Sequence, residues 1–118
     1  TTPSTTPVLP DDKELLRGKC IIAIGSYMPE MREIPDAVLD LVDNVYIELP
    51  YACEESGDLS QPLASGKLTK DRIKLMHEYL ISGEKEIKEG QTTYFKSVGM
   101  GLFDVCIAQK LYEVAKEK

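Results

Sequence analysis

Two short stretches combine small, polar and aromatic residues at points where an apolar run ends. The first is Gly25-Ser26-Tyr27-Met28-Pro29, which follows the apolar residues 19–24. The second is Lys96-Ser97-Val98-Gly99, which closes the β-prone run 92–96. In open parallel sheets, ligands bind beyond the carboxyl ends of the strands. Each stretch is therefore either an ordinary connection or a loop shaped to hold a ligand.

The segments that carry these stretches follow an α/β pattern. Residues 19–24 form a continuous apolar run between two glycines, which is typical of a strand covered on both faces of a parallel sheet. Residues 35–42 predict a helix that starts at a proline, and residues 45–49 alternate as a strand does. These three segments form a small βαβ unit. The pattern also predicts helices over 11–16, 51–58, 69–82 and 98–116, and a third strand over 92–96.

The last predicted helix, residues 98–116, is apolar on more than one side. A helix of this kind needs partners on several sides. Three strands and the other helices are too few to cover it, so we expect residues 1–118 to be part of a larger parallel-sheet domain. The sequence contains no GxGxxG fingerprint for a dinucleotide pyrophosphate.

Composition excludes several classes of function. The net charge is −6 over 118 residues, whereas nucleic-acid binding needs a basic surface, so no nucleic-acid partner is expected. No apolar run reaches the roughly 20 residues that a membrane-spanning helix needs, so no membrane association is expected. The three cysteines, Cys20, Cys53 and Cys106, lack CxxC spacing and are interpreted as buried, reduced thiols of a cytoplasmic protein. His77 has no partners spaced as zinc ligands, and no metal is expected.

Three collinear stretches of the sequence resemble one known family. Residues 2–9 (TPSTTPVL), 23–33 (AIGSYMPEMRE) and 95–99 (FKSVG) are similar to segments of the ornithine cyclodeaminase/mu-crystallin family, and residues 55–59 (ESGDL) are similar to its acidic Gly-Asp segment. The resemblance implies a longer, homodimeric protein in which a Rossmann domain that binds NAD or NADP follows a dimerisation and substrate domain. Residues 1–118 then correspond to the C-terminal half of that Rossmann-like domain with the terminal helix. The expected fold is α/β, a partial Rossmann-like parallel sheet flanked by helices.

The resemblance also assigns cofactor-binding roles to individual residues. Thr2 and Ser4 match the turn beside the nicotinamide ribose, and Gly25 and Ser26 match the loop that passes the nicotinamide ring. The segment that closes over the carboxamide is matched by Lys96, Ser97 and Gly99.

Small residues and free backbone N–H groups in these turns would let a flat ring approach. A helix starting at Val98 would add partial positive charge there. For Lys96, the alternative interpretation is a strand-end charge that reaches solvent.

Tyr27 stands where cyclodeaminases and alanine dehydrogenases of the family carry an aspartate implicated in proton transfer. A phenol has an ordinary pKa of about 10, so it is a poor base in neutral solution although it donates a hydrogen bond. Tyr27 is the candidate catalytic residue, and its alternative is a partly exposed loop aromatic. The change disfavours ornithine cyclisation and favours reduction of cyclic imines (ketimines) of amino acids, in which the cofactor supplies the hydride.

Two other functions remain open from the sequence. One is a non-catalytic, mu-crystallin-like protein that binds NADPH and a small ligand. The other is a small α/β interaction domain with no cofactor. The partners implied by the resemblance are a small-molecule amino acid or cyclic imine substrate and a second copy of the complete protein. Residues 1–118 alone are expected to be inactive, because half of the cofactor site lies outside them.

Overall fold

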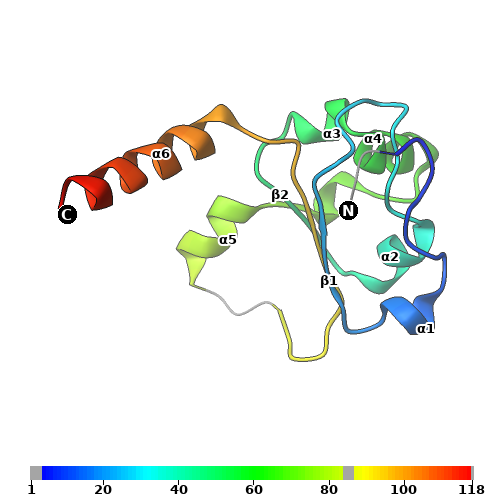
Figure 1. The fold of residues 1–118 in the computed structure, drawn as a ribbon. Coiled ribbons are helices and arrows are strands. Elements are labelled where there is room, and N and C mark those ends of the chain that lie inside the picture. Colours follow the sequence, from blue (N-terminus) through cyan, green and yellow to red (C-terminus); the bar gives the residue numbers. More distant parts are fainter. Residues whose placement is uncertain (1–3, 84–86, 118) are drawn as a thin grey trace.

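A computed structural model describes residues 4–83 and 87–117 of the chain. Four strands form a single parallel sheet in the order β1-β4-β2-β3. Figure 1 views this sheet nearly edge-on, with α5 on one side of it and α2 on the other. Their bounds are β1 Cys20–Ala23, β2 Val45–Ile47, β3 Ile73–Leu75 and β4 Thr93–Lys96. The prediction of a parallel α/β sheet is confirmed.

Six α-helices and one 3-10 helix lie in the described part of the chain. They are α1 Lys13–Leu16, α2 Asp36–Leu41, α3 Ala52–Glu55, α4 Gly57–Ser65, α5 Met76–Ser82, α6 Gly101–Lys116 and the 3-10 helix η1 Lys70–Arg72. Local chemistry explains several ends. The Asp12 carboxylate accepts from the N–H groups of Glu14 and Leu15 at the start of α1, and Ser56 caps α4 through the N–H of Asp58.

The sheet register brings the carboxyl ends of three strands together. Lys96 at the end of β4 pairs with Ala23 of β1 on one side and with Ile47 of β2 on the other. Residues that follow these positions therefore emerge at one edge of the sheet, which is where ligands bind in open parallel sheets.

One face of the sheet carries the hydrophobic core. Helices α1 to α4 contribute Leu16, Val38, Ala52 and Leu59 to this core, and they meet Ile21, Ala23, Val45, Ile47 and Tyr94 of the strands. On the opposite face, Tyr46 packs against Tyr79 of α5 with ring centroids 5.1 Å apart. Tyr46 is buried on that face, whereas Ile22 of β1 is exposed.

The prediction that residues 19–24 are covered on both faces is wrong within the described chain. Ile21 and Ala23 are buried, but Ile22 is 52% exposed and Ile24 is 63% exposed. Alternate residues of a strand point to opposite faces. The apolar run therefore has a covered face and an open face.

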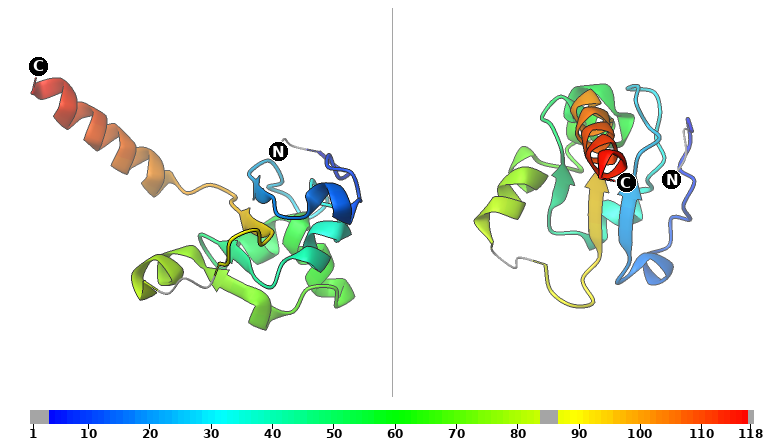
Figure 2. Two further views of the ribbon diagram at one scale, coloured as in Figure 1. Left: turned by 90° about the horizontal axis from the view of Figure 1, so that it is seen from below. Right: turned by 60° about the vertical axis from the view of Figure 1, so that its left-hand side comes forward.

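Helix α6 projects away from the rest of the molecule as a single rod (Figure 2). It has no buried residue, although Leu102, Phe103, Val105, Ile107 and Leu111 are all apolar. The helix begins at Gly101 and not at Val98, because residues 97–100 form a connection that is neither helix nor strand.

The single helix predicted over residues 69–82 is also wrong. Residues 70–72 form η1, residues 73–75 form β3, and only residues 76–82 form a helix, α5. Pairing with β2 overrides the helical pattern. Arg72 secures this arrangement by donating to the carbonyl oxygens of Leu39 and Val42 at the end of α2.

The helix predicted over residues 51–58 is divided in two. Helix α3 ends at Glu55, and a new helix, α4, starts at Gly57 and was not predicted. Ser56 is extended, which stops the first helix, and its side chain caps the second.

The cysteines depart from the prediction in their burial. All three thiols are free, but Cys20 and Cys106 are exposed and Cys53 is half-buried. Cys20 lies on the open face of β1, and Cys106 lies on the projecting α6, so neither is enclosed by the core.

Residues 4–83 and 87–117 contain neither a cluster of metal-ligating side chains nor a helix that could span a membrane. No three His, Cys, Asp or Glu side chains gather there as metal ligands would. No helix in that part has the length and apolar character that a bilayer crossing demands.

Candidate functional site

The turns that follow β1 and β4 lie next to each other at the carboxyl edge of the sheet. The N–H of Ser97 donates to the carbonyl oxygen of Ala23 at 3.0 Å, which extends the β1–β4 pairing into the turns. The two stretches that the sequence marked as candidate loops, 25–29 and 96–99, are therefore neighbours. They form the candidate site.

A buried carboxylate, Glu33, organises the turn after β1. Its Oε1 accepts hydrogen bonds from the N–H groups of Gly25 at 2.8 Å and Ser26 at 2.6 Å. The same oxygen lies 2.8 Å from Nζ of Lys96, and both side chains are fully buried. One oxygen thus joins the β1 turn to the end of β4.

Asp58, at the first turn of α4, completes this buried cluster. Its Oδ1 accepts from the N–H groups of Glu33 at 2.8 Å and Ile34 at 3.0 Å, and its Oδ2 lies 3.3 Å from Nζ of Lys96. Burial raises the pKa of Asp58, and the two backbone N–H groups and Lys96 oppose that rise. We call Lys96, Glu33 and Asp58 the buried ion cluster.

The N-terminus of α4 also holds the loop beyond Tyr27. The N–H of Gly57 donates to the carbonyl oxygen of Met28 at 3.0 Å, and Ser56 Oγ lies 2.8 Å from Ser26 Oγ. A Cβ atom on Gly57 would lie 2.2 Å from the carbonyl oxygen of Met31. This close approach requires glycine at position 57, and it holds the loop beyond Tyr27 against the N-terminus of α4.

The turn after β4 is held by a second carboxylate, Glu48, which follows β2. Its Oε1 accepts from Ser97 Oγ at 2.8 Å, from the N–H of Val98 at 2.6 Å and from the N–H of Gly99 at 3.0 Å. Gly99 has φ +87°, a left-handed conformation that glycine adopts without strain. Two turns at the same edge are therefore each stabilised by an internal carboxylate.

The expectation of free backbone N–H groups in these turns is wrong. The N–H groups of Gly25 and Ser26 bond Glu33, and those of Val98 and Gly99 bond Glu48. Because α6 begins only at Gly101, the positive end of a helix does not lie at Val98 either.

The sequence-predicted site residues differ in their exposure. Tyr27 is 45% exposed and Gly99 is exposed, whereas Ser4 and Ser97 are half-buried. Gly25, Ser26 and Lys96 are buried. Lys96 does not reach solvent, so that alternative is wrong. Thr2 lies outside the described residues.

Ser4 nevertheless belongs to the same neighbourhood. Its carbonyl oxygen accepts from the N–H of Arg32 at 2.9 Å, and the N–H of Val8 donates to the carbonyl oxygen of Glu33 at 2.9 Å. Residues 4–8 therefore run beside the segment that carries Glu33.

Reasoning from the sequence missed Glu33, Glu48 and Asp58 as site residues. One signal was available for Glu33, which lies in the 23–33 stretch of the resemblance, whereas Glu48 lay within the predicted strand 45–49. Asp58 lies in the Gly-Asp segment of the resemblance, but the sequence alone assigned no role to it.

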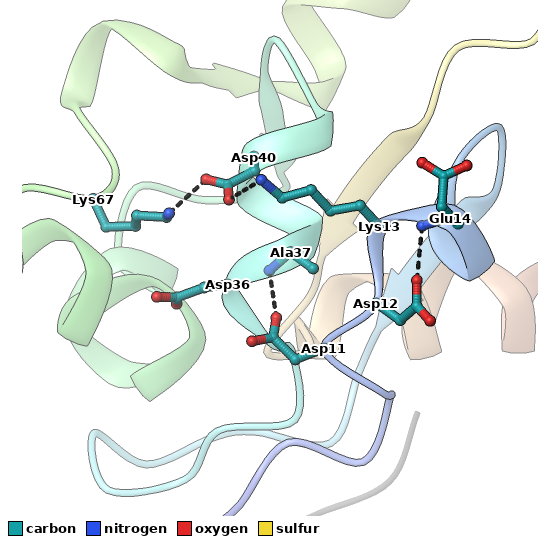
Figure 3. Close-up of a pocket in the computed structure, with 8 residues that line it drawn as sticks. All are labelled: Asp11, Asp12, Lys13, Glu14, Asp36, Ala37, Asp40 and Lys67. Carbon is teal, nitrogen blue, oxygen red and sulfur yellow. Dashed lines mark hydrogen bonds and ion pairs between the residues drawn. The ribbon is translucent and has the colours of Figure 1, made fainter.

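A separate hollow of about 570 Å³ lies between α1 and α2 (Figure 3). Its carboxylates are bonded within the chain: Asp11 accepts from the N–H of Ala37, and Asp40 pairs with Lys13 and Lys67. Lys13 and Lys67 hold the pKa of Asp40 below its ordinary value. Because these carboxylates are already paired within the chain, we interpret the hollow as a surface feature of the helical layer and not as a ligand site.

The comparison with known proteins identifies the family. The chain belongs to the ornithine cyclodeaminase/mu-crystallin family, whose sequence model matches residues 1–118. A curated relative, the Delta(1)-pyrroline-2-carboxylate reductase of Bacillus cereus, is 37% identical over 121 residues, which cover all of this chain and 37% of the relative. The chain therefore spans little more than a third of the length of the curated relatives it matches.

Solved structures confirm the Rossmann-like arrangement of the sheet. A probable ornithine cyclodeaminase from Bordetella pertussis superimposes with a TM-score of 0.82 at 29% identity, over all of this chain and 38% of that one. The Delta(1)-pyrroline-2-carboxylate reductase of Thermococcus litoralis, solved with NADH and L-proline, gives a TM-score of 0.79 at 24% identity, over 97% of this chain and 36% of that one. The second likeness concerns the fold alone.

Proposed function

We propose that residues 1–118 form the C-terminal half of the NAD(P)-binding domain, with the terminal helix, of a reductase for cyclic imines of amino acids. The observation that carries the proposal is the 37% identity to a curated pyrroline-2-carboxylate reductase across the whole chain. The complete enzyme transfers a hydride from NADH or NADPH to the carbon of a C=N bond next to a carboxylate, while a proton goes to the nitrogen. The product is a cyclic amino acid.

The surface at the carboxyl edge suits the nicotinamide end of such a cofactor. Ile24, Tyr27 and Gly99 are exposed there, and Ser97 and Val98 are half-buried. Because the backbone donors beneath this surface are already bonded to Glu33 and Glu48, a flat ring can cover them without leaving a buried donor unpaired. We assign ring contact to Ile24, Tyr27 and residues 97–99.

The cofactor, when bound, supplies the hydride, and the chain supplies position. The Tyr27 hydroxyl is an exposed hydrogen-bond donor at this edge and is our candidate for holding the substrate or the ring. The buried residues of the two turns do not contact the ring in this proposal; they support the exposed residues above them. These buried residues are Gly25, Ser26 and Lys96.

Helix α6 supports the assignment to a larger protein. Its exposed apolar side chains form a surface that water solvates poorly. We propose that α6 packs on another part of the complete protein, that this protein is a homodimer, and that it works in the cytoplasm.

The test is an assay of the complete protein with NADH and NADPH. Consumption of the reduced cofactor in the presence of pyrroline-2-carboxylate supports the reductase. Tight NADPH binding with no turnover of cyclic imines would favour the binding protein of the mu-crystallin kind, and failure to bind either nucleotide would overturn the proposal.

Two substitutions at one position sharpen this assay. Tyr27→Phe removes the hydroxyl, and Tyr27→Asp restores the carboxylate that other members of the family carry. We expect Tyr27→Phe to lower turnover of the imine and leave cofactor affinity within about twofold, because only one hydrogen bond is lost.

A further inference from the structure

The Lys96 side chain has no accessible surface although it lies at the edge where the cofactor is proposed to bind. Its ammonium is enclosed by Glu33 and Asp58, at 2.8 Å and 3.3 Å. A group enclosed in this way cannot contact a ligand above the turns unless the turns open. The role of Lys96 must therefore be sought in what it holds.

Glu33 Oε1 is the atom through which Lys96 can act on the site. That oxygen accepts from Lys96 Nζ and from the N–H groups of Gly25 and Ser26, all within 2.8 Å. Lys96 ends β4, and Gly25 and Ser26 start the turn that leads to Tyr27. The contact therefore sets the spacing between the β1 turn and the β4 turn.

Asp58 fixes the backbone of the same segment. Its Oδ1 accepts from the N–H groups of Glu33 and Ile34, so the peptide that carries the Glu33 side chain cannot shift without breaking these bonds. The cluster links the end of β4, the 25–34 loop and α4, three parts that are distant in the sequence.

We propose that Lys96, Glu33 and Asp58 are positioning residues that hold the 25–27 and 97–99 turns at the separation the nicotinamide ring requires. This inference rests on the proposed function. The buried ion cluster does not touch the cofactor; it sets the shape of the surface that does. Buried charges in such a cluster favour one arrangement, because each shift leaves a charge without its partner.

The test is a double-mutant cycle in the complete protein, with Glu33→Gln and Lys96→Met made singly and together. The dissociation constants of NADH and NADPH are measured for each variant. If Lys96 acts through Glu33, each single substitution raises the dissociation constant of the cofactor about tenfold. The dissociation constant of the double variant then exceeds that of the weaker-binding single variant by no more than about twofold. Independent contacts with the cofactor would multiply to about 100-fold.

A ligand without the ring separates positioning from general damage. ADP-ribose, or its 2′-phosphorylated form if the protein prefers NADPH, carries the whole cofactor except the nicotinamide ring. We expect its affinity to stay within about twofold in all variants, because the cluster lies at the ring end. Equal weakening of both ligands would overturn the inference in favour of a merely structural cluster.

Two controls keep the result interpretable. Lys74→Met removes an exposed lysine of β3 and should leave both affinities unchanged. If Lys96→Met does not fold, as judged by circular dichroism melting, Lys96→Arg takes its place, since the larger guanidinium keeps the charge but does not fit the enclosed site.

The outcomes separate the two levels of proposal. A wild-type protein that binds neither the cofactors nor the ring-less ligands overturns both. A wild-type protein that binds them, with variants whose effects multiply or are absent, overturns only the positioning role.

Discussion

Glu48 and Val98 follow neighbouring parallel strands and are joined by a hydrogen bond of 2.6 Å between the Val98 N–H and the Glu48 carboxylate. The same carboxylate oxygen accepts from Ser97 and Gly99. The conformation of the β4 turn thus depends on the side chain that follows β2, although Glu48 and Val98 are 50 residues apart in the chain.

Replacing Glu48 by alanine should loosen this turn. The substitution removes the acceptor of two backbone N–H groups and one hydroxyl, so we expect faster hydrogen exchange of the Val98 and Gly99 amides and a loss of about 1–3 kcal/mol of stability. Hydrogen exchange with mass spectrometry on the peptide around residue 98 measures the first effect. Glu48→Gln, which keeps one acceptor oxygen, is the matched control. Unchanged exchange in Glu48→Ala would contradict the assignment.

Removing the charge of Lys96 should be far more costly than removing that of a surface lysine. Lys96→Met leaves two carboxylates buried without their cation, and breaking a buried ion pair in this way costs about 3–5 kcal/mol. Urea unfolding of the complete protein gives the difference. Lys74→Met, at the exposed position of β3, should change the free energy of unfolding by less than ~0.5 kcal/mol. Similar changes in the free energy of unfolding for the two variants would show that water reaches the buried ion cluster.

Gly57→Ala should displace the loop of residues 28–31, which packs against Gly57. The new Cβ atom would meet the carbonyl oxygens of Met31 and Pro29 at 2.2 and 2.4 Å. Overpacking against backbone costs about 1–3 kcal/mol, and we expect the loop that bears Tyr27 to lose affinity for its ligand as well. Ala64→Ser adds one atom to an exposed position of the same helix and serves as the control. Thermal melting and cofactor titration read the two effects.

The pair of lysines around Asp40 predicts a specific acid dependence of stability. Lys13 and Lys67 lower the pKa of Asp40 below its ordinary value of 3.8. A carboxyl whose folded pKa is lowered contributes stability that is present above the unfolded pKa and is lost as the pH falls through the folded pKa. We therefore expect Asp40→Asn to be less stable than the wild type above about pH 5 and equal to it in strong acid.

The Asp40 effect should also be small and sensitive to salt. The Asp40 side chain is 30% exposed and that of Lys13 is 53% exposed, so the difference should stay below about 1 kcal/mol. It should shrink further when salt is raised, because exposed charges are screened. A difference that persists at low pH would point to an effect other than the ion pairs.

Several elements of this fold follow from local sequence alone. The apolar run before Gly25 predicts β1, the alternation at 45–49 predicts β2, and the proline at 35 predicts the start of α2, because strand period and helix ends depend on neighbouring residues. The same is true of the two turns, whose small residues directly follow the predicted strands. These features need no knowledge of distant parts of the chain.

Long-range pairing determined the rest. Residues 73–75 follow a helical pattern, yet they form β3 because Val45–Ile47 offers them unpaired backbone groups at the sheet edge. Local propensity is too weak to resist a ladder of hydrogen bonds and burial against a neighbour.

The sequence by itself determined that polar turns close β1 and β4 of a parallel α/β sheet, since those signals lie within a few residues of each other. Only the tertiary structure decided what the turns rest on. Lys96 and Glu33 are 63 residues apart. A lysine at the end of a predicted strand is equally consistent with a solvent-exposed charge. Its enclosure by two carboxylates arises from the meeting of β4, the 25–34 loop and α4, which no local pattern encodes.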